Sequence, residues 1–444
     1  MAALGSQRKQ MPGVAERHAD EVDFLWAMRD FAARSAAHDL DALARWDERL
    51  DAHLDGLRFA GESGWNAALE LLKRKAEQDK GWGSAFGAAW MAVEQGDFER
   101  FAAVLDLAVG GNRGGDKAVI AALAFASPER AQRFLRPLVT AKHAILQRMG
   151  IAAAAAHGRD LGFGAKGAEG DPKPQVFDPG QDLATALGAT DAALRARAAR
   201  AVGQLGRRDL ARALDFLHDD PDPKCRYAAI WAKAVLSDSA AGQMLWSFCQ
   251  PNAPFVEEAM CLAAVMDPLE APRKIREFAE RGGDVRAALL GAAALGDSAL
   301  VPWLFEQMRS PDQARLAANA LVCLTGINLQ AKRLTVKPPP TVQLGPNDDP
   351  NDENVKMDPD HGLAWPNVDA LQTWWSGVRR DYPAGTRFWL GKSMDQGGAE
   401  AALRDGNQKL RRAAAWYLAK TAPGRGLFEV RAPAMRQRAL LGGP

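Results

Sequence analysis

A short phrase recurs between about residues 190 and 330, and it constrains the fold of this chain more than any other feature. The phrase is an Arg or Glu, then two or three mostly Ala or Leu positions, then a second apolar cluster. Its copies begin at Arg197, Arg226, Glu257, Arg286 and Arg315, so they lie 29, 31, 29 and 29 residues apart. That interval holds two short helices and two tight turns. The sequence therefore predicts an all-α fold, an α-solenoid of stacked helical hairpins.

An α-solenoid presents a long surface built from neighbouring repeats. Such a surface is suited to holding another macromolecule, so the fold class predicts binding rather than catalysis. The four arginines of the phrase are expected on equivalent helices. Each arginine either ties its helix to the turn of the next repeat or contributes to a binding surface.

Composition narrows the partner and the compartment. The chain of 444 residues is 47% apolar and 25% charged, and its formal charge of +1 gives no overall attraction to nucleic acid or to an anionic membrane. Residues 1–13 lack the apolar stretch of a secretory signal. Uninterrupted apolar runs such as 118–126 and 151–156 are far shorter than the ~20 residues that cross a bilayer. We expect a cytoplasmic protein without a membrane span.

The cysteines and histidines give no sign of a metal or redox site. Cys225, Cys249, Cys261 and Cys323 form no Cys-x-x-Cys pair, and we expect them to be buried among apolar side chains. The seven histidines are dispersed, and no two have the four-residue spacing of a zinc protease. We expect no metal and no cofactor.

Changes in composition divide the chain into six segments. We expect a flexible leader over 1–20, an N-terminal helical region over 21–157, a Gly/Pro linker over 158–180, regular repeats over 181–330, a Pro-rich and acidic loop over 331–362, and a Trp-rich helical cap with a basic tail over 363–444. The N-terminal region consists of either irregular hairpins or divergent repeats. A cap is expected because the last repeat would otherwise leave an apolar face in water.

Local signals inside the repeats agree with helical hairpins. Aspartates stand before several apolar-periodic runs, where a carboxylate can cap free amide groups: Asp191, Asp209, Asp220, Asp284 and Asp297. Gly206 and Gly296 follow such runs and are expected to end helices in the left-handed conformation.

Parts of the chain resemble two known families. The phrases at 220–232 (DPDPKCRYAAIWA) and 285–297 (VRAALLGAAALGD) resemble HEAT-like repeats of the bilin-lyase type, over roughly the middle third of the chain. Over nearly the whole chain, five segments resemble a proteobacterial family of uncharacterised HEAT-like proteins: 24–30, 50–65, 363–366, 374–375 and 431–433. Its members are commonly encoded in type VI secretion gene clusters. The resemblance implies a setting, and the family offers no established activity or catalytic residues to carry over.

Two glycine motifs resemble nucleotide-binding loops in letters alone. Residues 162–167 match G-x-G-x-x-G, but they follow an Ala-rich helix and precede prolines, whereas the motif needs a strand before it and a helix after it. Gly391, Lys392 and Ser393 resemble the end of a phosphate-binding loop, but the preceding glycine is too far away. We expect a buried turn at 391–393.

The sharpest functional signal is a contrast of charge in the last hundred residues. Six carboxylates gather near His361: Asp348, Asp349, Asp352, Glu353, Asp358 and Asp360. Their spacing matches no calcium loop, so they predict a solvated acidic loop or one that docks on a basic surface. The basic stretch that follows offers candidate protein-binding residues: Arg404, Lys409, Arg411, Arg412, Arg431, Arg436 and Arg438. It either pairs with the acidic loop, binds an acidic protein surface or, less favoured, contacts nucleic acid.

Three functions remain open at this point. The favoured one is a non-enzymatic protein-binding scaffold or adaptor for an effector, chaperone or spike component of a type VI secretion system. The second is an immunity protein against a cognate toxin. The third is a helical-repeat enzyme of the DNA-glycosylase or bilin-lyase kind, for which the sequence offers no catalytic residue. The oligomeric state is left open.

Overall fold

The computed structural model describes residues 13–78, 83–109, 114–158, 180–339, 342, 358–422 and 424–442. Within these residues the chain is almost wholly helical, and its strands form one two-stranded hairpin. The predicted all-α fold is confirmed. The described residues divide into two compact units: unit 1 comprises 13–31, 42–158 and 432–436, and unit 2 comprises 32–41, 180–431 and 437–442.

Unit 1 is built from helical pairs. The helices that begin in or belong to it are α1 (Val14–Ala32), α2 (Leu40–Ala60), α3 (Glu62–Glu77), α4 (Gly83–Gln95), α5 (Phe98–Val109), α6 (Gly115–Phe125), α7 (Pro128–Val139) and α8 (Ala144–His157). Helices α4, α6 and α8 pack in succession. They begin 32 and 29 residues apart, close to the interval of the later phrase. Helix α1 begins at Val14, so the expected leader over 1–20 is helical from that residue, and residues 1–12 lie outside the described part.

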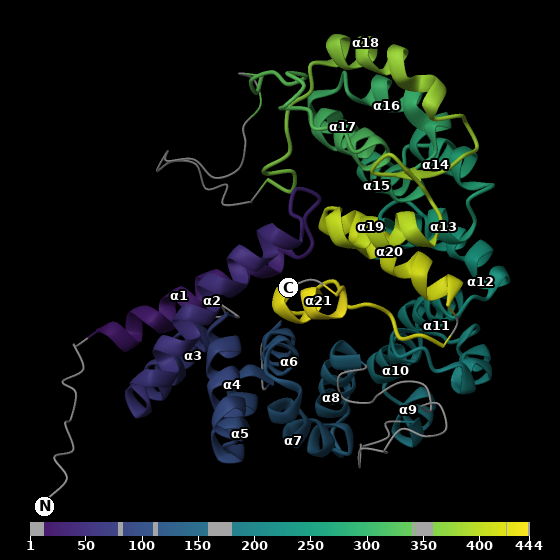
Figure 1. Ribbon diagram of the computed structural model, residues 1–444. Coiled ribbons are helices and arrows are strands. Elements are labelled where there is room, and N and C mark those ends of the chain that lie inside the picture. Colours follow the sequence, from purple (N-terminus) through teal and green to yellow (C-terminus); the bar gives the residue numbers. More distant parts are fainter. Residues whose placement is uncertain are drawn as a thin grey trace, which may run out of the picture. The chain divides into compact units, whose positions relative to one another are not determined.

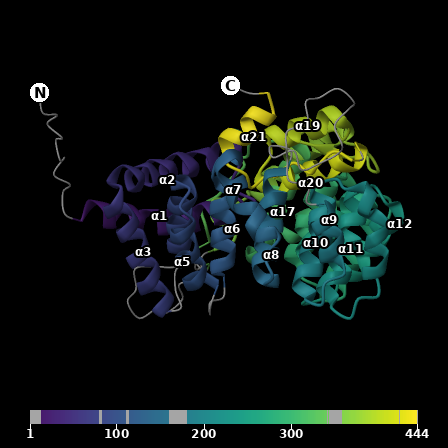
Figure 2. The same ribbon diagram turned by 90° about the horizontal axis from the view of Figure 1, so that it is seen from below.

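Unit 2 contains the regular repeats. Its first helices are α9 (Gly180–Leu187), α10 (Ala192–Gln204), η2 (Arg208–Leu217), α11 (Pro223–Val235), α12 (Ser239–Met244), η3 (Leu245–Phe248), α13 (Val256–Met266), α14 (Ala271–Glu280), α15 (Val285–Leu295), η4 (Ser298–Leu300), α16 (Val301–Gln307) and α17 (Pro311–Thr325). The phrase falls on α10, α11, α13, α15 and α17, which we call the repeat helices. They follow one another in space in chain order (Figure 1), and α9, α10 and α11 stand side by side (Figure 2). The shorter helices between them are the connecting helices. The expected linker over 158–180 falls mostly on residues 159–179, outside the described part.

Small side chains let the repeat helices approach closely. The Ala-rich runs of α13 and α15 are buried almost throughout. A Cβ added at Gly203 would lie 2.8 Å from the Cα of Ala232 on the next repeat helix, and one at Gly291 would lie 2.6 Å from Cγ of Met260. These contacts leave no room for a larger side chain at either glycine. The repeated phrase therefore indicates close packing between consecutive repeat helices.

The helix ends follow the local signals in most places. Asp191, Asp284 and Asp297 accept hydrogen bonds from the first free amides of α10, α15 and η4, as expected. Asp222, rather than Asp220, caps α11. Asp209 lies inside η2 and pairs with Arg207 instead of capping. Gly296 ends α15 at a φ of 70°, and Gly206 follows α10 at 67°, in the left-handed conformation that glycine adopts without strain.

The described residues from 358 onward include elements that lie along the repeat helices. Their elements are α18 (Val368–Val378), η5 (Arg379–Asp381), β1 (Phe388–Trp389), β2 (Lys392–Ser393), α19 (Gln396–Asp405), α20 (Gln408–Thr421) and α21 (Ala434–Leu440). Helix α20 packs on α11, α13 and α15 (Figure 1). It runs alongside α13 in the same direction, because Lys409 near its start pairs with Glu257 and Lys420 near its end donates to the carbonyl of Met266.

The same region covers the C-terminal ends of the repeat helices, where backbone carbonyls lack a partner inside the helix. The amide of Leu427 donates to Gln204 of α10 over 2.7 Å, that of Phe388 to Gly296 after α15 over 2.8 Å, and that of Leu390 to Cys323 of α17 over 2.7 Å. The segment expected to cap only the last repeat is therefore a strip along the whole row of repeat helices. Its tryptophans Trp389 and Trp416 are buried at its centre.

Candidate binding surface

The arginines of the repeated phrase lie on successive repeat helices, as expected, but at different turns. Arg226 is the fourth residue after the cap of its helix, Arg286 the second and Arg315 the fifth. Arg197 is the sixth residue after Asp191. Their partners differ as well: Arg286 and Arg315 both bind Asp360, Arg226 donates to the carbonyls of Asp220 and Pro221, and Arg197 donates to the side chain of Gln204.

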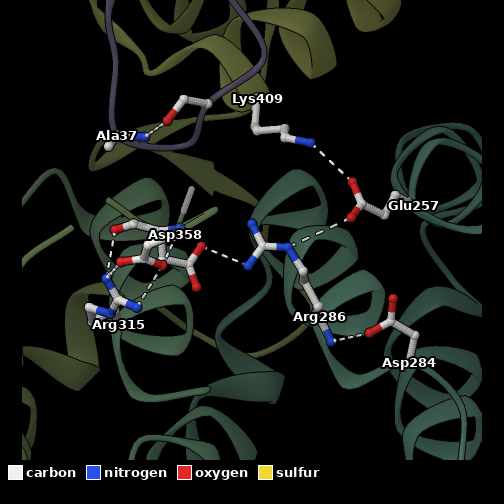
Figure 3. A network of polar contacts seen from close by, with 9 residues as sticks. Ala37, Glu257, Asp284, Arg286, Arg315, Asp358 and Lys409 are labelled. Atoms are coloured by element: carbon white, nitrogen blue, oxygen red, sulfur yellow. Dashed lines mark hydrogen bonds and ion pairs between the residues drawn. The ribbon is translucent and has the colours of Figure 1, made fainter. Parts of the chain in front are cut away.

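Arg315 binds the end of the acidic loop. Its Nη1 and Nη2 donate to the two carboxylate oxygens of Asp358 over 2.6 and 3.0 Å, and Nη1 also donates to the carbonyl of Asp360 over 3.0 Å (Figure 3). Its guanidinium lies 5.0 Å from the ring centre of Trp365. Burial alone would raise the pKa of Asp358, but the hydrogen bonds from Arg315 and from the amide of Asp360 lower it below its ordinary value.

A chain of ion pairs continues from this point to α20. Asp360 accepts from Nη1 of Arg286 over 2.7 Å, Nε of Arg286 lies 3.7 Å from Oε1 of Glu257, and Nζ of Lys409 lies 3.1 Å from Oε2 of the same glutamate (Figure 3). The network thus joins the acidic segment, α15, α13 and α20. The described carboxylates of the acidic loop pair with the repeat arginines and not with the basic stretch. Asp348, Asp349, Asp352 and Glu353 lie outside the described residues.

A second cluster joins the first three repeat helices. Arg200 of α10 forms a two-pronged ion pair with Glu258 of α13, one prong measuring 2.8 Å, and the hydroxyl of Tyr227 on α11 donates to the same glutamate over 2.9 Å. Burial opposes the charge of Glu258, yet Arg200 and Tyr227 lower its pKa to about 2. Arg200 also stacks 3.7 Å above the ring centre of Trp231. These groups hold the first three repeats together.

Most of the basic residues named as candidates for binding have partners within the chain. Arg411 is fully buried and donates to the carbonyl of Leu403 and to the side chains of Gln408 and Gln437. Lys409 pairs with Glu257, Arg412 stacks on Trp416, Arg436 donates to the carbonyl of Ala126, and Arg438 pairs with Asp41. Arg404 and Arg431 are exposed. The basic stretch therefore does not present its seven candidates as one exposed patch.

The second glycine motif lies at the tip of the hairpin, so the expected turn is present, but residues 391–393 are exposed rather than buried. Leu390 and Gly391 both have positive φ, 52° and 76°, as a two-residue hairpin turn requires. Their amides donate to the carbonyls of Cys323 and Leu324 at the end of α17. In a phosphate-binding loop these amides would donate to the ligand, whereas here they donate to carbonyls at the end of α17. Residues 162–167, the first motif, lie outside the described part.

Two histidines meet that the sequence gave no reason to pair. Nδ1 of His18 and Nδ1 of His53 lie 3.1 Å apart on α1 and α2. Among the described residues no group of three or more His, Cys, Asp or Glu side chains is placed to hold a metal ion. Nor does any described helix have the length and apolarity to cross a bilayer.

One cavity in unit 2 combines apolar walls with positive charge. It measures about 400 Å³ and lies between α11, η3 and the turn before α13. Apolar side chains such as Ile230, Phe248 and Phe255 form most of its wall, and its ionisable lining residues are His218 and Arg226. No carboxylate lines it among the described residues. A depression of about 550 Å³ in unit 1 is lined by acidic and basic side chains alike, so its charge favours no class of ligand.

The sequence reasoning missed Arg195, Arg200 and Glu258 as ion-pairing residues. The sequence does contain a signal for Arg195. The aspartates that cap α10 and α11, Asp191 and Asp222, lie 31 residues apart, and so do Arg195 and Arg226, so the two arginines hold equivalent positions. No comparable signal marks Arg200 and Glu258, which lie 58 residues apart on helices that are not neighbours in sequence.

Comparison with known proteins adds no relative. No protein-family model, no curated protein and no solved structure matches the chain.

Proposed function

We propose that this chain is a non-enzymatic protein-binding adaptor of the cytoplasm that uses the layer of connecting helices, rather than the inner face of the repeats. Helix α20 covers part of the repeat helices. The ion-pair network from Asp358 to Lys409 occupies the charged groups at their N-terminal turns. The surface that we propose for the partner is therefore the layer of connecting helices.

The observation that carries the proposal is the exposure of large apolar side chains in three consecutive connecting segments. Phe216 of η2 is 86% exposed, Met244 of α12 43% and Leu269, in the turn before α14, 91%. Single exposed apolar residues are common on soluble proteins, whereas recurrence in the same layer of successive repeats is the pattern that an extended interface produces. Binding of a partner would remove these side chains from water.

The setting follows the resemblance of the sequence to HEAT-like proteins encoded in type VI secretion gene clusters. The partner that we name on this basis is an effector, a chaperone or a spike component of such a system. If the partner is a toxin and the chain protects cells against it, the same surface serves an immunity protein instead.

The test is affinity capture of the tagged protein from its native cytoplasm, followed by mass spectrometry of proteins retained in near-equal amount. The variant Phe216→Ser, Met244→Ser, Leu269→Ser should lose the retained protein. Phe59→Ser is the matched control, because Phe59 is 80% exposed but lies in unit 1. Capture of no protein, or equal capture by the triple variant, would contradict the proposal.

A further inference from the structure

Arg195 and Arg226 occupy the same position in consecutive repeats. Each lies four residues after the aspartate that caps its helix. Nη1 of Arg195 donates to the carbonyls of Ala189 and Thr190, five and six residues earlier, over 2.8 and 2.9 Å. Nη1 of Arg226 does the same with Asp220 and Pro221, over 2.6 and 3.1 Å. In both repeats the guanidinium is therefore anchored by Nη1 to the two carbonyls that lie five and six residues earlier.

The two arginines differ in whether a carboxylate from the next repeat pairs with them. Nε and Nη2 of Arg195 form a two-pronged ion pair with Asp220, over 2.7 and 2.9 Å. Asp220 stands three residues before α11, and the residue three before α13 is Ala253. Arg226 consequently has no carboxylate partner among the described residues, although its anchoring is the same.

In the repeat of Arg226, the position that corresponds to Asp220 opens into the cavity of about 400 Å³. Arg226 and Ala253 both line it, and so does His218, whose Nε2 is buried without a hydrogen-bond partner among the described residues. Phe255, which also lines the cavity, is held by stacking on Tyr227, with ring centres 4.4 Å apart. The cavity therefore offers an oriented guanidinium and an imidazole against an apolar wall.

We propose that this cavity binds an acidic side chain of a protein partner, with its carboxylate on Arg226 and an adjacent apolar side chain against the wall of Met244 and Phe255. The inference rests on the proposed function and names the chemistry of the partner. Guanidinium and carboxylate groups form two-pronged hydrogen bonds, as Arg195 and Asp220 already do in this chain.

A protein, rather than a free carboxylate, suits the surroundings. Phe216 lies two residues before His218 and is 86% exposed, and Met244 is 43% exposed at the cavity itself. A small acid would leave both in water, whereas a polypeptide that inserts one acidic residue can cover them.

The first experiment titrates the full chain with a blocked peptide, acetyl-Ala-Leu-Glu-Leu-Ala-amide, and with its Gln counterpart, while methyl NMR reports on Met244. The Glu peptide should shift the Met244 signal and bind about tenfold or more tighter than the Gln peptide, which is the usual scale for a charge-assisted hydrogen bond. Sodium acetate at equal concentration separates a free carboxylate from a peptide. Equal binding of the two peptides, binding of acetate alone, or no saturable shift by millimolar peptide would overturn the proposal.

Two variants complete the test. Arg226→Gln should weaken the Glu peptide about tenfold or more, while Arg212→Gln, an exposed arginine of η2 that does not line the cavity, should leave it unchanged. Ala253→Asp places a carboxylate where Asp220 stands in the preceding repeat, so it should raise the melting temperature and abolish peptide binding. Retained peptide binding by Ala253→Asp would overturn the proposal even if Arg226→Gln proved unstable.

Failure of this inference is distinguishable from failure of the proposed function. If Arg226→Gln captures the same protein as the wild-type chain, the cavity is not the docking point and the adaptor function stands. If the wild-type chain captures no protein, the adaptor function itself fails.

Discussion

Replacing Arg315 by Met should destabilise unit 2 strongly, because it leaves a carboxylate unpaired at a nearly buried position. The side chains of Arg315 and Asp358 are only 10% and 9% exposed, and the guanidinium makes three hydrogen bonds. Removing one partner of such a buried pair costs about 3–5 kcal/mol, whereas an exposed pair contributes about 0–1 kcal/mol. We therefore expect a loss of about 3 kcal/mol in the free energy of unfolding.

The assay is urea unfolding followed by tryptophan fluorescence and circular dichroism, since Trp365 lies under the Arg315 guanidinium. The double variant Arg315→Met, Asp358→Asn should cost less than the two single variants together, by about 1–3 kcal/mol, because it leaves no unpaired charge. Arg273→Met is the control: Arg273 also has carboxylate partners, Glu270 and Glu277, but is 57% exposed. A loss for Arg315→Met no larger than for this control, or strict additivity in the double variant, would refute the reasoning.

Three other predictions test the packing and the charges. Trp389→Ala should cost about 3–5 kcal/mol in unfolding free energy, because Trp389 is fully buried and its Nε1 donates to Ala294; a loss below about 1 kcal/mol would contradict this packing. The pKa of Glu258 is lowered from 4.5 to about 2, so its contribution to stability is complete above pH 4.5 and disappears as the pH falls toward 2; Glu258→Gln should flatten that part of an acid-unfolding curve, and an unchanged slope would argue against the ion pair. The four cysteines are buried, and burial raises the pKa of Cys225 to about 11 and of Cys249 to about 12; a thiol reagent should label them only after urea is added, and rapid labelling of the native protein would contradict their burial.

The repeat helices were predictable because their signals are local. Capping aspartates such as Asp191 and Asp284, the left-handed Gly296 and the Ala-rich phrase each act within a few residues, so they can be recognised without knowledge of the fold.

The position of the C-terminal region was not predictable in the same way. Its contacts join residues far apart, such as Lys409 and Glu257 at a separation of 152, and many use backbone carbonyls at helix ends that carry no sequence signal. The burial of Arg411 could not be predicted, because arginine side chains are usually exposed. Its burial depends on the carbonyl of Leu403 and on Gln437, 26 residues further along. The cavity at Arg226 carries no sequence signal either, because its lining residues come from three separate segments of the chain.

Hydrogen exchange of the chain, alone and bound to its captured partner, tests the adaptor proposal most directly. Binding through the connecting layer should slow exchange in η2, in α12 and in the turn before α14, around Phe216, Met244 and Leu269, and should leave α20 unchanged. Slowed exchange in α20 and α13, with no change in the connecting segments, would show that the partner uses the inner face and would contradict the proposal.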